Sequence, residues 1–265
     1  MPNLIDTHCH LDIIEQEGLS INDSLEKSTV AGVSKIVQIG IDYKSSIEAE
    51  RIAKEFSKPS LEIFYTIGCH PADSIHFSEK TKISQLVQAK KEDSKMVGIG
   101  EIGLDFYHAK DSTDEQISVF SNFLDLAWDL KLPVIIHSRD SAESTFHVLS
   151  KYKGRVSGVI HCFTYDYEYA KKFCDLGFYI SFSGIVAFKN ATDIHDAARK
   201  LPLKSILIET DAPFLAPPPF RGKRNDSSNL TYILEKIYSL RNESNTMVEE
   251  TIYQNSLNFI SRKAP

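Results

Sequence analysis

Histidines and carboxylates end six β-rich segments of this chain, and side chains of these two types can bind metal ions. The residues are His8, His10, His70, Glu101, His137, His161 and Asp211. Imidazole nitrogens and carboxylate oxygens are common ligands of zinc and related divalent cations. If the segments are neighbouring parallel strands, their carboxyl ends meet at one edge, and these side chains converge on shared cations. This pattern predicts a metal-dependent hydrolase.

The pair His8 and His10 and the single Glu101 give the strongest local signals. Side chains two residues apart share a strand face, so both imidazoles point together while Thr7 and Cys9 point away. A single histidine in such a place is more often structural, but an H-x-H pair can hold one cation. Burying Glu101 at a barrel mouth is costly unless it is paired or metal-bound, and its carboxylate can bridge two cations.

The expected ligand set defines a specific chemistry. Two divalent ions about 3.5–4 Å apart generate a hydroxide nucleophile at neutral pH and neutralise charge on a phosphoryl or carbonyl oxygen. We expect two ions, held by His8, His10, Glu101, His137, His161 and Asp211, with Asp211 as the proton acceptor. The candidates are Mg²⁺, Mn²⁺ and Zn²⁺; four nitrogen ligands favour zinc, manganese or cobalt over magnesium, and the sequence leaves the ion open.

Eight β-rich runs alternate with amphipathic stretches along the whole chain. We expect strands at 3–8, 35–40, 61–67, 96–101, 133–137, 157–161, 178–182 and 206–210. Helices are expected from Asp114 to Leu130, from an N-cap at Asp140 with Glu143 as its reciprocal carboxylate, and at 229–240 and 246–261. The α/β pattern and the length predict a (β/α)8 TIM barrel, a single domain over 1–265 with an appended C-terminal helix. An open doubly wound sheet would need a Gly-rich phosphate turn after its first strand, and that turn is missing.

Composition limits the setting and the partners of the protein. The 30 basic and 36 acidic residues give a formal charge of −6, which argues against a broad, sequence-independent nucleic-acid track but allows a strand end to be held locally. Four cysteines without a C-x-x-C pair favour a reducing compartment. Without a secretory signal or a long apolar run, we expect a cytoplasmic protein with no membrane contact, and a monomer.

Several residues near the expected ligands are candidates for secondary roles. Three cations in four residues, Arg221, Lys223 and Arg224, could hold substrate phosphates together with Arg139, although a solvated loop is the plain alternative. His70 and Asp105 are weaker candidates for contacting the leaving group or ordering a ligand, and Glu209 for supporting one. We assign no role to the remaining histidines, His76, His108, His147 and His195.

Seven ordered motifs between Asp6 and residue 226 resemble the TatD-type metal-dependent deoxyribonucleases of the amidohydrolase superfamily. They are D-T-H-C-H-L-D (6–12), G-C-H-P (68–71), G-E-I-G-L-D-F-Y (100–107), L-P-V-I-I-H-S-R-D (132–140), H-C-F (161–163), E-T-D-A-P-F-L (209–215) and R-G-K-R-N (221–225). The resemblance implies a (β/α)8 fold, divalent metals held by the same six residues, and hydrolysis of DNA phosphodiester bonds, typically from a 3′ end, with single-stranded DNA or a 3′ end as the substrate. The chain departs from the pattern at Ala72, Tyr165 and Asp226, positions that bear on substrate grip.

Two other functions remain open from the residues alone. The same metal site can serve an amidohydrolase or an aminoacyl-tRNA deacylase, since an activated water attacks carbonyl carbon as readily as phosphorus. Related amidohydrolases often bridge their metals with a carboxylated lysine, and Glu101 at this place favours the nuclease. A barrel that has lost its chemistry and acts as an interaction module is a third possibility, against which the complete ligand set argues.

Overall fold

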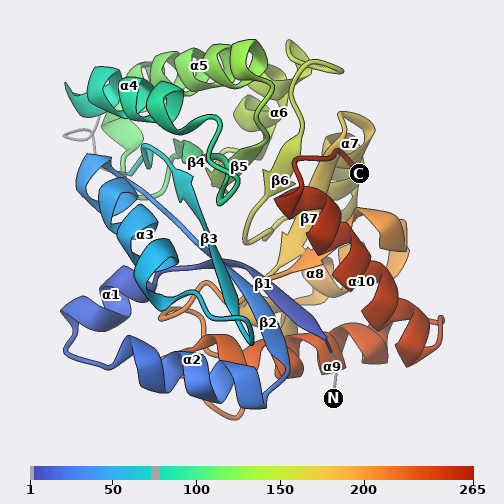
Figure 1. Cartoon of the computed structure of the whole chain (residues 1–265). Helices are drawn as coiled ribbons and strands as arrows, with labels where there is room; N and C mark the ends of the chain where they lie inside the picture. Colours follow the sequence, from blue (N-terminus) through green and yellow to red (C-terminus); the bar gives the residue numbers. More distant parts are fainter. Residues whose placement is uncertain (1–2, 73–77) are drawn as a thin grey trace.

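The chain forms an eight-stranded parallel barrel in which sequence order and spatial order agree. The computed structural model describes residues 3–72 and 78–265. Each strand pairs with the next in the order β1 to β8, which confirms the expected (β/α)8 architecture (Figure 1). The strands are β1 Leu4–Cys9, β2 Val33–Gln38, β3 Glu62–Ile67, β4 Met96–Asp105, β5 Val134–Arg139, β6 Gly158–Ile160, β7 Phe178–Phe182 and β8 Ile206–Ile208.

Helices alternate with the strands and surround them (Figure 1). The helices are α1 Leu11–Gln16, α2 Ile21–Val30, α3 Tyr43–Phe56, α4 Lys80–Lys90, α5 Thr113–Leu130, α6 Ala142–Ser150, α7 Tyr167–Asp175, α8 Thr192–Lys200, α9 Leu230–Leu240 and α10 Asn245–Ile260. Helix α6 begins one residue later than expected: its N-cap is Ser141, whose hydroxyl bonds the carbonyl of Leu104 at 3.0 Å instead of capping the helix. The hydroxyl of Ser141 therefore bonds to β4 and does not cap the helix, although the local sequence resembles a capping pattern.

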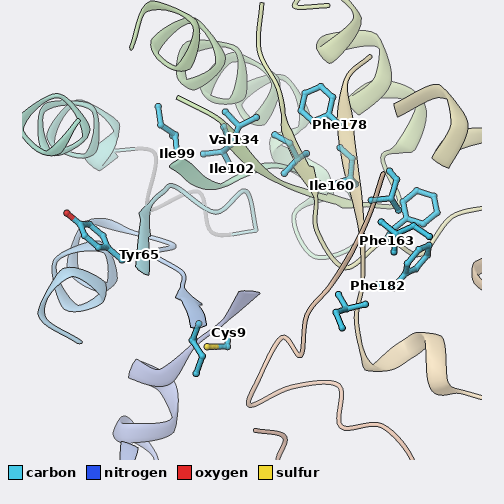
Figure 2. Close-up of a cluster of buried hydrophobic side chains, with 14 of the residues drawn as sticks. Cys9, Tyr65, Ile99, Ile102, Val134, Ile160, Phe163, Phe178 and Phe182 are labelled. Atoms are coloured by element: carbon cyan, nitrogen blue, oxygen red, sulfur yellow. The ribbon is translucent and has the colours of Figure 1, made fainter. Parts of the chain in front are cut away.

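Two apolar layers lie on opposite faces of the strands. The outer layer packs strands against helices, and Figure 2 shows part of it, with Ile99, Ile102 and Val134 together and Phe163 beside Phe182. The inner layer fills the barrel with residues such as Ile5, Val37, Ile135, Val159 and Leu207. Alternation along β5, β6 and β8 continues the inner face to the polar residues that follow, whereas β1 and β4 each contain a bulge that changes the alternation before their polar residues.

Helix α10 closes the end of the barrel opposite the predicted metal site. Phe259 packs against the inner layer, its ring 6.5 Å from that of Tyr179, and Asn255 donates to the carbonyls of Leu203 and Ile206 at the start of β8. After the helix, Arg262 donates to the carbonyl of Met96 at the start of β4. The helix therefore ties β8 to β4 across the barrel floor. Within the described residues, no helix is long and apolar enough to cross a membrane.

We expect Phe259→Ala to lower the free energy of unfolding by about 3–5 kcal/mol, because the ring is 1% exposed and its removal leaves a cavity beneath the barrel. Urea denaturation measures this change. Met247→Ala on the same helix is the matched control, since Met247 is 54% exposed and its removal should change stability by less than about 0.5 kcal/mol. Equal effects of the two substitutions would contradict the assignment of α10 to the barrel core.

Candidate metal centre

The six expected ligands come together at the carboxyl ends of the strands. His8 and His10 lie at the end of β1, Glu101 within β4 and His137 within β5. His161 and Asp211 lie just after β6 and β8. The nearest atom pairs are His8 Nε2–His10 Nε2 3.3 Å, His8 Nε2–Glu101 Oε2 3.4 Å, His8 Nε2–Asp211 Oδ1 3.6 Å, His10 Nε2–Asp211 Oδ1 3.5 Å, His137 Nδ1–Glu101 Oε1 2.7 Å and His161 Nε2–Glu101 Oε1 3.0 Å. Two groups share His8: one with His10 and Asp211, the other with Glu101 and His161.

The arrangement around His8 fits a cation better than it fits hydrogen bonds. Nε2 of a neutral imidazole holds at most one proton, so it can donate to only one partner. His8 Nε2 nevertheless faces an imidazole nitrogen and two carboxylate oxygens within 3.6 Å. The ring is fully buried, and burial lowers the pKa of His8, which favours the unprotonated form that binds metal. A divalent cation satisfies all of these lone pairs at once.

Glu101 is the central charge of the cluster. Burial by itself raises the pKa of this carboxyl, but the neighbouring histidines outweigh burial and hold the pKa well below its ordinary value. Burial likewise opposes ionisation of Asp211, and the hydrogen bond from His10 together with nearby imidazoles brings its pKa down. Both carboxylates are therefore ionised, as metal ligands must be.

Bulges and close backbone approaches place these side chains. Between Asp6 and Cys9, β1 takes three steps against two on β2, and β4 takes three steps against two on β5 between Ile99 and Ile102. An extra residue of this kind re-aims the side chains that follow it, and each bulge lies at a ligand. At the end of β3, a side chain on Gly68 would put its Cβ 2.2 Å from the backbone nitrogen of Glu101, so only glycine fits.

The seam between β8 and β1 is built from the ligands' own backbone. Asp211 N–H donates to the carbonyl of His8 at 2.9 Å, and His10 N–H donates to that of Ala212 at 2.7 Å. Beneath them, the carboxylate of Asp6 accepts from the backbone and hydroxyl of Thr210, and burial raises its pKa to about 6. Asp211 has φ of 56°, a left-handed conformation that Asp tolerates better than most residues.

Two buried carboxylates orient the histidine ligands from behind. Glu209 accepts from His161 Nδ1 at 3.0 Å and from Cys162 N–H at 2.6 Å, which leaves His161 Nε2 facing Glu101. Asp105 accepts from His137 Nε2 at 3.0 Å, which leaves Nδ1 of that ring facing Glu101. Asp105 is completely buried, and its contact with His137 fits the second of its two expected roles, ordering a ligand.

Sequence reasoning missed His108, whose Nδ1 lies 2.9 Å from Asp105 Oδ2. The signal was the D-x-x-H spacing: the carboxylate of Asp105 accepts from the backbone N–H groups of Tyr107 and His108, and this turn brings the ring of His108 back to it. Of the other unassigned histidines, His195 bonds the carbonyl of Val186, and His76 lies outside the described residues.

His70 is held as a donor at the edge of the cluster. Ala72 N–H donates to Nδ1 at 3.1 Å, so the proton of the neutral ring is on Nε2, which faces Glu101 Oε1 at 3.4 Å. Burial lowers the pKa of His70, which keeps the ring neutral. A protonated Nε2 does not bind a cation, although the position lies near Glu101 and His137. The ring can instead donate a hydrogen bond toward the mouth of the site.

The expected basic residues lie around this mouth in different environments. Arg139 is exposed at the end of β5, its guanidinium 4.5 Å from the ring of Tyr107. Arg221 lies 4.7 Å over Phe188, and Arg224 pairs with Glu17 at 2.7 Å, while Lys223 is exposed. This ion pair partly neutralises the charge of Arg224. The sequence did not indicate the pairing, because Glu17 lies near the other end of the chain, just after α1.

Comparison with known proteins gives a consistent family assignment. The family model for TatD-related DNases matches residues 5–261. The uncharacterized metal-dependent hydrolase YabD of Bacillus subtilis is 37% identical over 239 residues, covering 90% of this chain and 91% of the relative. YcfH of Escherichia coli K12, named in the same way, is 35% identical over 241 residues, covering 90% and 88%.

A solved structure supports the same assignment. The structure of YjjV from Escherichia coli K12, described as a TatD homologue, superposes with a TM-score of 0.85 at 27% identity. The match covers 97% of each chain, so the barrel and the appended helix are both included.

We expect Mn²⁺ or Zn²⁺ at about 100 times its dissociation constant to raise the free energy of unfolding by about 2.7 kcal/mol. Burial opposes protonation of His10, His137 and His161, but adjacent carboxylates outweigh it and raise their pKa values. Protons therefore compete with metal, and the stabilisation should be present at about pH 8 and be lost toward pH 5.5. Thermal denaturation across this range measures the effect. A shift that grows on acidification would contradict the ligand set.

We expect Glu209→Gln to weaken metal binding about 10–100-fold, because the amide keeps an acceptor for His161 but removes the charge that raises the basicity of its ring. Isothermal titration calorimetry with Zn²⁺ measures the affinity directly. Glu143→Gln, an exposed carboxylate on α6, is the matched control and should bind metal like the wild type. An unchanged affinity for Glu209→Gln would show that this carboxylate supports the fold alone.

Proposed function

The chain belongs to the TatD-related DNase family of metal-dependent hydrolases, and we propose that its substrate is DNA, from which it releases nucleotides at a 3′ end of a single strand. The observation that carries the proposal is the joint arrangement of two sets of groups at one barrel mouth. Ionised carboxylates and imidazoles lie at its centre, and Arg139, Arg221 and Lys223 lie on the strand-end loops around it. The first set suits hydrolysis and the second suits a phosphate-bearing substrate.

Two divalent cations fit the donor set. His8, His10 and Asp211 would hold one, His137 and His161 would hold the other, and Glu101 would bridge them, since its two oxygens face different histidines. When bound, such cations supply an activated water and neutralise charge on the phosphoryl oxygens. Mg²⁺, Mn²⁺ and Zn²⁺ remain the candidates.

Asp211 is the proton acceptor in this proposal. Its carboxylate is ionised, as described above, and its Oδ1 lies near both His8 and His10. A water placed between this oxygen and the phosphorus gives up its proton to Asp211 as it attacks. The bond between phosphorus and the leaving oxygen breaks as the water attacks; the leaving oxygen takes up a proton from water, and Asp211 returns its proton to water. His70 Nε2–H, which lies 3.4 Å from Glu101 Oε1, would donate a hydrogen bond to a substrate oxygen.

In this proposal, the basic side chains around the mouth bind the substrate. Arg139 and Arg221 present planar guanidinium groups, which can bind phosphate with two parallel hydrogen bonds, and Lys223 adds a point charge. Both arginines also lie over aromatic rings, at Tyr107 and Phe188, which restricts their motion. A small neutral amide would have no use for these charges. We retain the expectations of a monomer and of a cytoplasmic location as predictions.

We expect Asp211→Asn to lower the rate of nucleotide release from a single-stranded oligonucleotide by at least about 10³-fold, because the amide cannot accept the proton. Glu101→Gln should be as severe, because it removes the bridging charge. Release is measured with added Mg²⁺, Mn²⁺ or Zn²⁺.

Asp129→Asn is the matched control, an exposed carboxylate on α5 that should leave the rate unchanged. An inactive wild type with all three ions, or full activity in both site variants, contradicts the nuclease. Hydrolysis of a cyclic amide or an aminoacyl ester in place of the oligonucleotide would identify one of the alternative functions.

A further inference from the structure

A cavity among the strand-end loops has no role in the proposed hydrolysis. Its volume is about 380 Å³, and it lies between the loops that follow β6, β7 and β8. Thr164 lines it from the first loop, Phe188 and Lys189 from the second, and Arg221 from the third. The volume lies within the range of about 300–1,000 Å³ typical of small-ligand sites.

The loops that form this cavity are continuous with the metal ligands. Thr164 follows His161 by three residues, and the loop that carries Arg221 begins at Asp211. Asn225 ties the far end of that loop back to the barrel, because its side chain donates to the carbonyls of Thr210 at 2.9 Å and Phe214 at 2.8 Å. A ligand in the cavity therefore contacts two loops that also carry proposed metal ligands, His161 and Asp211.

The lining combines cations with an apolar wall. The guanidinium of Arg221 lies 4.7 Å over the ring of Phe188, so the pair forms a flat surface, and Ile185 extends its apolar part. Lys189 adds an exposed second positive charge, and Asp193 is the acid among the lining residues. Thr164 and Asn190 supply neutral hydrogen-bonding groups. Two cations beside a flat apolar wall suit a phosphate attached to a sugar and a base.

The neighbouring part of the mouth, next to the β8–β1 seam, has the reverse charge. A cavity of about 490 Å³ between the segments that follow β1 and β2 is lined by Asp12, Glu15, Asp42 and Glu48, with Lys44 as the cation among its lining residues. Arg51 offsets part of this charge through ion pairs with Glu15 and Glu48. A phosphodiester backbone is repelled there and attracted toward the loops after β7 and β8.

We propose that the cavity between the loops after β6, β7 and β8 binds the nucleotide next to the cleaved bond, with Lys189 and Arg221 on its phosphate and the wall of Phe188 and Ile185 against its sugar and base. This inference rests on the proposed function, and it adds the direction in which the strand leaves the metal centre. The strand passes over the loops after β7 and β8 and away from the acidic cavity.

Lys189→Ala tests the proposal through binding, without catalysis. Wild type and variant are titrated against a fluorescently labelled single-stranded oligonucleotide in the presence of a chelator, and anisotropy gives the dissociation constant over a series of salt concentrations. We expect about tenfold weaker binding from the loss of one charged contact, and a slope of log affinity against log salt that is smaller by about 0.7. Lys189→Glu should weaken binding further, because it adds repulsion.

Lys44→Ala is the matched control, since Lys44 lines the acidic cavity after β1 and β2, and it should bind the oligonucleotide like the wild type. Phe188→Ala should also weaken binding, but with an unchanged salt slope, because it removes a wall and no charge. Lys189 is exposed, so its variants should fold normally, which a thermal denaturation curve checks. Lys189 variants that bind like the wild type, or a loss confined to Lys44→Ala, would overturn the proposal.

Hydrolysis separates this proposal from the function on which it rests. With metal added, Lys189→Ala should raise KM for an oligonucleotide about tenfold and affect bis(p-nitrophenyl) phosphate much less, because that diester lacks a flanking nucleotide. Equal KM values for the oligonucleotide in wild type and variant, with cleavage intact, reject the cavity and leave the nuclease standing. A wild type that cleaves neither substrate rejects the nuclease, whereas the binding titration still decides whether the cavity holds a nucleotide.

Discussion

A buried carboxylate among imidazoles is the constraint on which the rest of this structure depends. Glu101 is 3% exposed and lies within 3.4 Å of nitrogen atoms from His8, His70, His137 and His161. Removing so many polar groups from water is costly unless each finds a partner. Protons cannot satisfy all of these nitrogens and oxygens together, whereas divalent cations can. The carboxylates of Asp105 and Glu209 behind the rings, and the bulges in β1 and β4, all serve to keep these donor atoms facing inward.

The hydrogen bonds that close the barrel also position the residues of the site. The hydrogen bonds that join β8 to β1 use the backbones of His8, His10 and Asp211, and the carboxylate of Asp6 crosses the seam to Thr210. A displacement of β8 therefore moves a ligand as well as a strand. Helix α10 acts on this seam from the other end, because Asn255 holds the start of β8 while Phe259 fills the floor. The packing of α10 at one end of the barrel and the positions of the proposed ligands at the other end are therefore linked through the strands.

Patterns within single segments were enough to predict the strands and to select six side chains that the fold brings together. The alternation of strand and helix gives the barrel, and the barrel brings the strand ends together, so His8 and Asp211 meet although 203 positions separate them in the printed sequence. Contacts between segments far apart in the sequence were not predictable in this way. The pairing of Arg224 with Glu17 and the anchoring of Leu104 by Ser141 follow from tertiary geometry, whereas the bond of His108 to Asp105 lies within one turn that the D-x-x-H spacing indicates. At these positions, patterns within a segment indicate the type of residue, but the packing of distant segments decides which side chain it contacts.

Net charge is a poor guide to the partner of such a site, because charge acts over short distances in physiological salt. The chain carries a formal charge of −6, yet screening limits the reach of exposed charges to about 8–10 Å. A phosphate at the mouth therefore responds mainly to the nearest charged groups and hardly at all to charges elsewhere on the barrel. These nearby groups differ in sign: Lys189 and Arg221 lie on the loops after β7 and β8, whereas Asp12, Glu15 and Glu48 lie on helices α1 and α3. In the proposed function, this local difference in sign is what attracts and orients an anionic strand at an acidic protein.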